Sequence, residues 1–254
     1  VLKYKPDMIV TCAYGQILPK ELLDYPKYKC INVHASLLPK LRGGAPIHHA
    51  IMDGYYKTGI TIMYMDIKMD AGDIISQRET TITKDDTLKS LHDRLSEMGK
   101  DLLLETLPNI ISGNINPLKQ DESEVTYGYN ITKEDEKIDF TKTNTEVDNK
   151  VRALNPTPGA YTTLNGKRLK VYDVRLTDRY YANTIPGTIV GFEKDGIRVV
   201  AGNSEVILTD IALEGKKRCL AKDYLNGVDK KELLGVVLKW KKKRRKNKIN
   251  ILSL

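Results

Sequence analysis

The stretch INVHASLLPKLRGGAPIHHAI, residues 31–51, joins an apolar, strand-like start to a loop and then to a helix-like end. Asn32 and His34 stand two residues apart, so on a strand their side chains point to the same face, and the isoleucine and valine beside them point to the other. The Arg-Gly-Gly turn and the proline after it mark a helix start. Such a strand, loop and helix start is where open α/β sheets place their ligands. An Asn and a His alone on a strand are more often ordinary solvated residues, so the pair must be weighed with the rest of the chain.

Further strands and helices are predicted around this stretch. The segment 7–15 is a continuous apolar run that predicts a buried parallel strand, and 29–36 predicts a second. Residues 46–54 predict a short helix, and 58–67 and 73–82 predict two strands around a turn.

A long helix is predicted next. Apolar residues recur every three or four positions from Leu88 to Ile110, with start signals at 85–87. Pro108 is expected to kink this helix or to end it early. The polar, poorly periodic segment 116–134 is typical of a linker.

The second half of the chain has a different pattern. Residues 145–154 predict a helix, and several short strands follow with hairpin signals at Asn165-Gly166 and Asp195-Gly196. This pattern predicts a small, OB-like β-barrel. We therefore expect an α/β fold with four parts: a partial Rossmann-like domain in 1–115, a linker in 116–134, a C-terminal β-barrel domain in 135–238 and a basic tail in 239–254.

The composition limits the class of protein. The 254 residues are 41% hydrophobic and 29% charged, and no apolar run approaches the roughly 20 residues of a membrane span. Cys12, Cys30 and Cys219 are odd in number and lack C-x-x-C spacing, which favours a reducing cytoplasm. Eight Lys and Arg residues in 239–248 account for the net charge of +8. Such a tail is weak evidence for a specific RNA partner.

A third polar residue belongs with Asn32 and His34. Asp70 lies in the turn between the two predicted strands, where its carboxylate can reach a neighbouring strand end. Together the three could transfer an acyl group to an amine without a covalent intermediate. The Asn amide would donate to the developing oxyanion, the His would do the same or move the proton, and the Asp would hold the His.

Other chemistries find no support in the sequence. There is no serine nucleophile elbow, phosphate-binding Walker loop or dinucleotide fingerprint. None of the four histidines has the spacing of a zinc site, so no metal is expected. His48 and His49 are assigned to the helix surface or to packing.

Three segments together resemble the successive signatures of the folate-dependent formyltransferases that act on methionyl-tRNA. They are residues 31–51, TGITIMYMDIKMDAGDII at 58–75 and VRALNPTPGAYTTLNGKRLKV at 151–171. The first is shared with the wider group, whose other members formylate glycinamide ribonucleotide or sugar nucleotides. The second and third fit the tRNA enzymes better, and the resemblance runs from about residue 5 to about residue 238.

The resemblance implies a formyltransferase domain and a specific reaction. A formyl group would pass from 10-formyltetrahydrofolate, a co-substrate, to the amino group of methionyl initiator tRNA in a cytoplasmic, monomeric protein with no membrane partner. By position, Asn32, His34 and Asp70 become the catalytic residues, with Asp70 orienting His34. The family's folate loop matches Ser36, Leu37, Leu38 and Pro39. Its apolar surface suits a flat pterin ring, and its backbone N–H and C=O groups could bind the ring's edge.

Two alternatives stay open at this point. One is a formyltransferase for a small amine, either an amino sugar or glycinamide ribonucleotide. The other is an inactive, truncated RNA-binding remnant. The chain begins at Val1 without a Met, and the family has roughly another quarter of an α/β domain before this point, so the first domain is expected to be N-terminally incomplete.

Binding of tRNA by the second domain would require its basic side chains to cluster. The candidates are Arg152, Arg168, Lys170, Lys216, Lys217 and Arg218. On a strand, position 167 alternates with 168 and 170. Arg168 and Lys170 are therefore expected on one face, beside the 216–218 loop.

Overall fold

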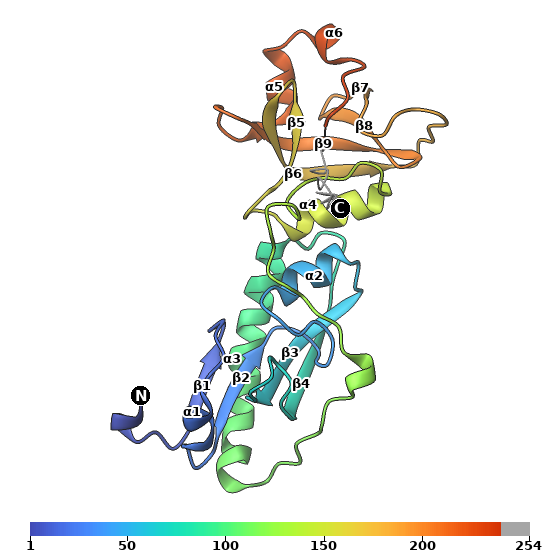
Figure 1. The fold of residues 1–254 in the computed structure, drawn as a ribbon. Coiled ribbons are helices and arrows are strands. Elements are labelled where there is room, and N and C mark those ends of the chain that lie inside the picture. The colour runs from blue at the N-terminus through green and yellow to red at the C-terminus, as the bar shows by residue number, and fades with distance from the viewer. Residues whose placement is uncertain (240–254) are drawn as a thin grey trace, which may run out of the picture.

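Two sheets organise the protein, whose structure, a computed structural model, describes residues 1–239 (Figure 1). The first has the strand order β1-β2-β3-β4, and the second has the order β5-β6-β9-β8-β7 with β10 paired to β9. In the first sheet β1 and β2 are parallel and the other pairs are antiparallel; all described pairs of the second sheet are antiparallel. The expected α/β domain followed by a β domain is confirmed.

The strands of the first sheet are β1 (Ile9–Cys12), β2 (Cys30–His34), β3 (Lys57–Tyr64) and β4 (Ile74–Thr81). Those of the second are β5 (Ala160–Leu164), β6 (Lys167–Thr177), β7 (Ile189–Phe192), β8 (Ile197–Ala201), β9 (Ser204–Leu213) and β10 (Cys219–Leu220). The α-helices are α1 (Lys20–Asp24), α2 (Pro46–Met52), α3 (Leu88–Ser112), α4 (Asn144–Ala153), α5 (Ala221–Asn226) and α6 (Lys230–Leu233). Short 3₁₀ helices lie at η1 (Leu2–Tyr4) and η2 (Glu122–Glu124).

The first strand differs from its prediction. β1 is parallel to β2 as expected, but it lies at the edge of the sheet and is not a buried strand. Val10 and Cys12 are exposed, and Thr11 is its one buried residue. A continuous apolar run cannot reveal whether a second neighbour covers the strand, and β1 has only β2 beside it among the described residues.

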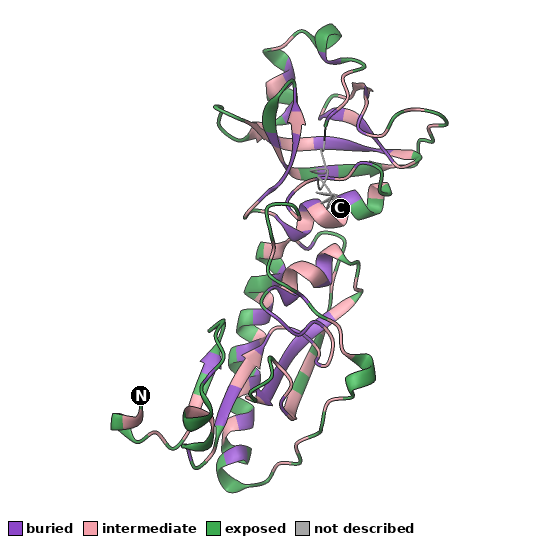
Figure 2. Ribbon diagram, viewed as in Figure 1, coloured by how far each residue is buried: buried purple, intermediate pink, exposed green. Residues whose placement is uncertain are grey.

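Helix α3 covers one face of the first sheet. Its leucines 91, 95 and 102 follow the helical repeat and form one core with Ile31, Ile60 and Ile62 of the sheet. Figure 2 shows the buried residues of this domain gathered on β2, β3 and the side of α3 that faces them. Thr87 caps the helix start in a capping box with Ser90, and Gly113 ends it with a positive φ of 77°. Pro108 lies within the helix, which continues to Ser112, so the expectation that this proline might end the helix early is wrong.

The second sheet closes on itself through a short segment at its C-terminal end. Residues 236–239 hydrogen-bond to Gly187 and Ile189 at the β7 end of the strand order, and Lys239 N donates to Thr163 O on β5, the other end. Closure removes the unpaired edges and encloses an apolar core that includes Phe140. The predicted β-barrel is therefore present. The expected basic tail lies outside the described residues from Trp240 onward.

The two domains meet at α4. This helix packs against α2, and its Ala153 belongs to the core of the first domain. The guanidinium of Arg152 donates to the backbone oxygen of Asp86, just before α3, at 2.8 Å. The carboxylate of the same Asp86 accepts hydrogen bonds from Arg94, Ser90 and Thr83 N.

Asp86 should make stability depend on acid. Burial alone would raise the pKa of this carboxyl, but the hydrogen bonds from Arg94, Thr83 and Ser90 lower it to about 2. A depressed pKa contributes stability above the unfolded value of about 4, and that contribution is lost as pH falls through about 2. We expect Asp86→Asn to lower the free energy of unfolding by about 2 kcal/mol at pH 7 and by much less at pH 2.

The measurement is denaturant unfolding at pH 7 and pH 2. Asp93→Asn is the matched control, because Asp93 pairs with Lys89 on the exposed side of the same helix. Equal losses for Asp86→Asn at both pH values would contradict this account.

Candidate active site

Asn32 and His34 lie on the face of the first sheet that α3 does not cover. The alternation of β2 sends Ile31 and Val33 toward α3 and the two polar side chains to the other side. His34 pairs in register with Thr61 of β3, which in turn pairs with Gln77 of β4. Polar side chains thus run across three strands on this face.

The imidazole of His34 is buried and fixed by the backbone. Its Nε2 lies 3.0 Å from the carbonyl oxygen of Leu41, which can only accept, so Nε2 carries a hydrogen. Nδ1 then faces the carboxylate of Asp70, at 3.7 Å from Oδ2. The ring is oriented by Leu41, and Asp70 lies at ion-pair distance from it without a hydrogen bond.

Asp70 reaches this position because the 65–73 loop folds back over the sheet. The residue has a φ of +50°, and its Oδ2 accepts a hydrogen bond from Gly43 N at 2.8 Å. Gly72 makes the close approach possible, because a Cβ there would lie 2.0 Å from Tyr64 O. In the sequence Asp-Ala-Gly, the aspartate thus supplies the carboxylate near His34, and the glycine allows the close approach of the loop to Tyr64 O.

The expected linker, residues 116–134, is an extended segment that we call the strap. It hydrogen-bonds to the 36–45 loop and to the 65–73 loop of the site. Arg42 N donates to Thr126 O, and Gly128 N donates back to Arg42 O. The side-chain amide of Gln120 donates to the carbonyls of Asp70 and Gly72, each at 2.8 Å. The buried guanidinium of Arg42 in turn donates to the Gln120 side-chain oxygen.

The loop expected to contact folate has most of its polar groups occupied. Thr61 Oγ1 donates to Ser36 O and accepts from Leu38 N. Leu38 O accepts from Gln77, Leu37 O accepts from Lys40 N, and Pro39 O accepts from Thr126 N. Little backbone is thus left to bind the edge of a ring, and what this loop offers outward is chiefly the half-buried Leu37 and Pro39.

A basic hollow lies in the second domain, away from Asn32 and His34. It has a volume of about 690 Å³ and is lined by Arg168, Lys170, Lys216, Lys137 and Lys239, with one acid, Glu214. The side chains of Arg168, Lys170 and Lys216 form no ion pair among the described residues. Arg168 and Lys170 line the same hollow, together with residues 214–216; of the expected 216–218 loop only Lys216 lines it.

The other expected basic residues have different surroundings. The Arg152 guanidinium is largely buried and bonded to Asp148, Asn149 and Asp86 O. Arg218 pairs with Asp210 and lies over the Tyr172 ring, 4.0 Å from its centroid. Lys217 is exposed and does not line the hollow.

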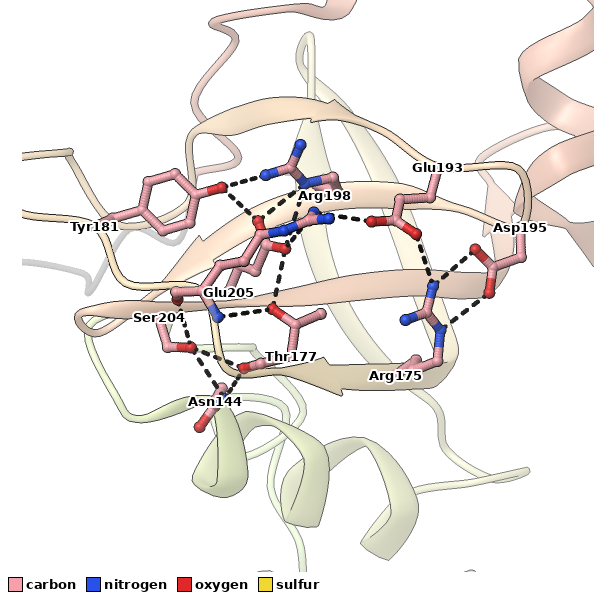
Figure 3. A network of polar contacts seen from close by, with 10 residues as sticks. Asn144, Arg175, Thr177, Tyr181, Glu193, Asp195, Arg198, Ser204 and Glu205 are labelled. Atoms are coloured by element: carbon pink, nitrogen blue, oxygen red, sulfur yellow. Dashed lines mark hydrogen bonds and ion pairs between the residues drawn. The ribbon is translucent and has the colours of Figure 1, made fainter.

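A second group of arginines in the barrel also forms ion pairs with acidic side chains. Figure 3 shows the fully buried Glu205 carboxylate bound by Arg198 and the Tyr181 hydroxyl. Arg179 joins the same carboxylate, and Arg175 pairs with Asp195. The charges of these arginines are paired with acidic side chains, of which only Glu205 is fully buried, while Arg175 and Arg179 lie at the surface.

Sequence reasoning missed several residues of the site, namely Thr11, Arg42, Thr61, Gln77 and Gln120. Thr11 Oγ1 lies 2.9 Å from Asn32 Oδ1. Thr11 could have been suspected from the sequence, because it is a polar residue inside the apolar run 7–15. The strap residues gave no signal, because their partners are far away in the sequence.

Among residues 1–239, no group of three or more His, Cys, Asp or Glu side chains could hold a metal ion. No helix in that part of the chain is long and apolar enough to cross a membrane. His49 contacts Asp53 and the Tyr129 carbonyl, so it ties α2 to the strap.

This fold and polar face define a formyl-group transferase with a second, C-terminal domain. The formyl transferase family model matches residues 1–107, and the model of the formyl transferase C-terminal domain matches residues 130–229. The chain therefore belongs to the formyl transferase family.

Curated relatives are more specific. The methionyl-tRNA formyltransferase of Bacillus velezensis is 55% identical over 230 residues, which are 89% of this chain and 72% of the relative. That of Bacillus subtilis is 54% identical over 241 residues, which are 93% of this chain and 75% of the relative.

Solved structures share the fold at lower identity. HypX from Aquifex aeolicus in complex with tetrahydrofolic acid has a TM-score of 0.66 and 21% identity, over 87% of this chain and 39% of that one. The N-formyltransferase from Helicobacter canadensis, in complex with folinic acid and dTDP-3-aminofucose, has a TM-score of 0.62 and 23% identity, over 77% of this chain and 70% of that one.

Proposed function

We propose that this protein transfers the formyl group of 10-formyltetrahydrofolate to the amino group of methionyl initiator tRNA. The observation that carries the proposal is the convergence of Asn32, His34 and Asp70 on one sheet face. They converge in a chain that is 54–55% identical to methionyl-tRNA formyltransferases. Residues 1–115 would perform the transfer, 135–238 would bind tRNA, and 116–134 would connect them and brace the site.

Asn32 stabilises the charge that develops in the reaction. The amine nitrogen attacks the formyl carbon, and the carbonyl oxygen becomes negative as the new C–N bond forms. The Asn32 side chain receives a hydrogen bond on Oδ1 from Thr11, which leaves the two Nδ2 hydrogens for the oxyanion. Collapse of the intermediate breaks the bond between the formyl carbon and N10 of the folate.

His34 moves the proton that the amine must lose. Because Nε2–H is held by Leu41 O, Nδ1 is the nitrogen that accepts it. The imidazolium then lies between the Leu41 carbonyl and the Asp70 carboxylate, and both stabilise its positive charge. The proton leaves on N10 as that bond breaks. Proton transfer of this kind typically contributes about 10²- to 10⁴-fold in rate.

The folate ring would pack on apolar side chains of the 36–39 loop. Since the backbone groups there are mostly bonded within the protein, Leu37 and Pro39 contribute contact area rather than hydrogen bonds. Ser36 and Leu38 shape the loop from inside, where both are buried.

The phosphates of tRNA would bind at the basic hollow of the barrel. Arg168, Lys170 and Lys216 line this hollow and form no ion pair among the described residues, and Lys217, exposed beside Lys216 in the chain, would add to the positive charge nearby. Arg152 and Arg218 are left out, because their guanidinium groups serve partners inside the protein. We place this reaction in the cytoplasm and assign it to a monomer, with the three free cysteines in keeping with a reducing compartment.

The function is tested by comparing formyl acceptors. Charged initiator tRNA, an amino sugar nucleotide and glycinamide ribonucleotide are offered at equal concentration with 10-formyltetrahydrofolate. Formylation of the charged tRNA at a kcat/KM at least about 10²-fold above either small amine is expected, because only tRNA uses the basic hollow. Preference for a small amine would reject the tRNA assignment. No transfer to any of the three acceptors would contradict the proposed formyl transfer and favour the inactive, RNA-binding alternative.

The tRNA surface is tested by salt dependence. Arg168→Ala combined with Lys216→Ala should weaken tRNA binding and reduce the slope of log affinity against log salt by roughly one unit per lost phosphate contact. Lys194→Ala is the matched control, since Lys194 is an exposed lysine of the same domain outside the hollow.

A chain ending at Lys239 separates the contribution of the sequence that follows. If that deletion alone removed all salt-dependent binding, or if the double substitution changed no more than Lys194→Ala, the hollow would not be the tRNA surface.

A further inference from the structure

We propose that Thr11 is a positioning residue for Asn32 and fixes which end of the Asn32 amide faces the reaction. This inference rests on the proposed function of Asn32 and assigns a role to a strand that the three family-like motifs leave out. Thr11 lies within β1, which pairs only with β2 among the described residues.

The sheet register places the two side chains together. β1 and β2 are parallel, with Thr11 opposite Asn32, so both side chains stand on the face that α3 does not cover. The flanking residues Val10 and Cys12 point to the other face and are exposed. Thr11 is thus the one buried side chain of an otherwise open strand, with 8% of its surface accessible.

The hydroxyl of Thr11 has one hydrogen and three acceptors near it. Asn32 Oδ1 lies at 2.9 Å, Met65 Sδ at 3.2 Å and Ile31 O at 3.3 Å. Asn32 Oδ1 lies closer to the hydroxyl than the Ile31 carbonyl oxygen, an acceptor of the same kind, and an amide oxygen is a stronger acceptor than the Met65 thioether. The hydrogen therefore goes to Asn32, and the Asn32 oxygen is turned toward β1.

This bond decides the polarity of the catalytic amide. An Asn side chain offers an acceptor at one end and two donors at the other. With Oδ1 held by Thr11, the donors of Nδ2 face the reacting carbonyl oxygen, as stabilisation of an oxyanion requires. The reverse orientation would present a lone pair to the same oxygen and repel it. A donor that is already oriented before charge develops needs no reorganisation during the reaction, and it therefore stabilises the transition state more strongly.

The test replaces the hydroxyl and keeps the shape. Thr11→Val should lower kcat about ten-fold, the size of one neutral hydrogen bond, with KM for both substrates within two-fold of the parent. Thr11→Ser restores the donor and should recover most of the rate. Thr58→Val is the matched control, because Thr58 is also buried, in β3, and its hydroxyl has no hydrogen-bond partner among the described residues.

A double-mutant cycle separates positioning from a structural role. In an Asn32→Ala background, followed under single-turnover conditions, Thr11→Val should cost no further rate, since the amide it orients is absent. An equal loss in both backgrounds would overturn the proposal, and so would an unchanged kcat in Thr11→Val alone.

A second measurement does not depend on formyl transfer. High-resolution crystal structures of the parent and of Thr11→Val are compared at Asn32. One amide orientation is expected in the parent, with Oδ1 toward Thr11, and a rotated or doubled orientation in the variant. The same single orientation in both would overturn the role of Thr11 even if the chain formylated no acceptor, whereas the proposed function would fail by the acceptor comparison alone.

Discussion

The alternation of side chains along β2 is the constraint on which the site depends. Ile31 is fully buried in the core with α3, and this fixes which face Asn32 and His34 must take. Because the side-chain period of a strand is two, a slip of one residue would move the polar pair into the apolar core and the isoleucine into the site. Pairing with β1 and β3 holds the register from both sides.

Hydrogen bonds connect the loops of the site to one another. The Asp70 carboxylate bonds to Gly43 N, His34 bonds to Leu41 O, and Gln120 from the strap bonds to the carbonyls of the Asp70 turn. Each loop thus has a partner from another part of the chain. This mutual support allows Asp70 to stand at a positive φ close to the imidazole without lying on a regular element.

Periodicity and turn chemistry predicted the elements well, because their causes are local. The capping residue Thr87, the hairpin at Asn165-Gly166 and the shared face of Asn32 and His34 all follow from short-range rules. The sequence did not reveal which segments far apart in the chain contact one another. An apolar run does not show which strands will pair with β1, and a polar segment does not show that it will lie along the 39–45 loop.

The same limit applies to charge. Arg152 and Arg218 look like Arg168 in the sequence, yet two of the three are neutralised or bonded inside the protein. Arg152 pairs with Asp148 one turn earlier in its own helix and adds the distant backbone oxygen of Asp86, and Arg218 pairs with Asp210 on β9. Helical spacing could have indicated the first pair, but the contacts with Asp86 and Asp210 are seen only in the folded chain. The fold could therefore be predicted more fully than the set of basic side chains that have no acidic partner. Likewise, Asn32, His34 and Asp70 could be predicted from the sequence, whereas the residues that hydrogen-bond to their loops could not.

The central claim is that the Asn32 amide stabilises the transition state of formyl transfer. The most direct measurement is the single-turnover rate of Asn32→Ala with saturating 10-formyltetrahydrofolate and charged initiator tRNA, alongside its unfolding transition. The account predicts a rate about 10²- to 10³-fold below that of the parent, with the unfolding transition little changed. A near-normal rate in a folded Asn32→Ala variant would contradict it.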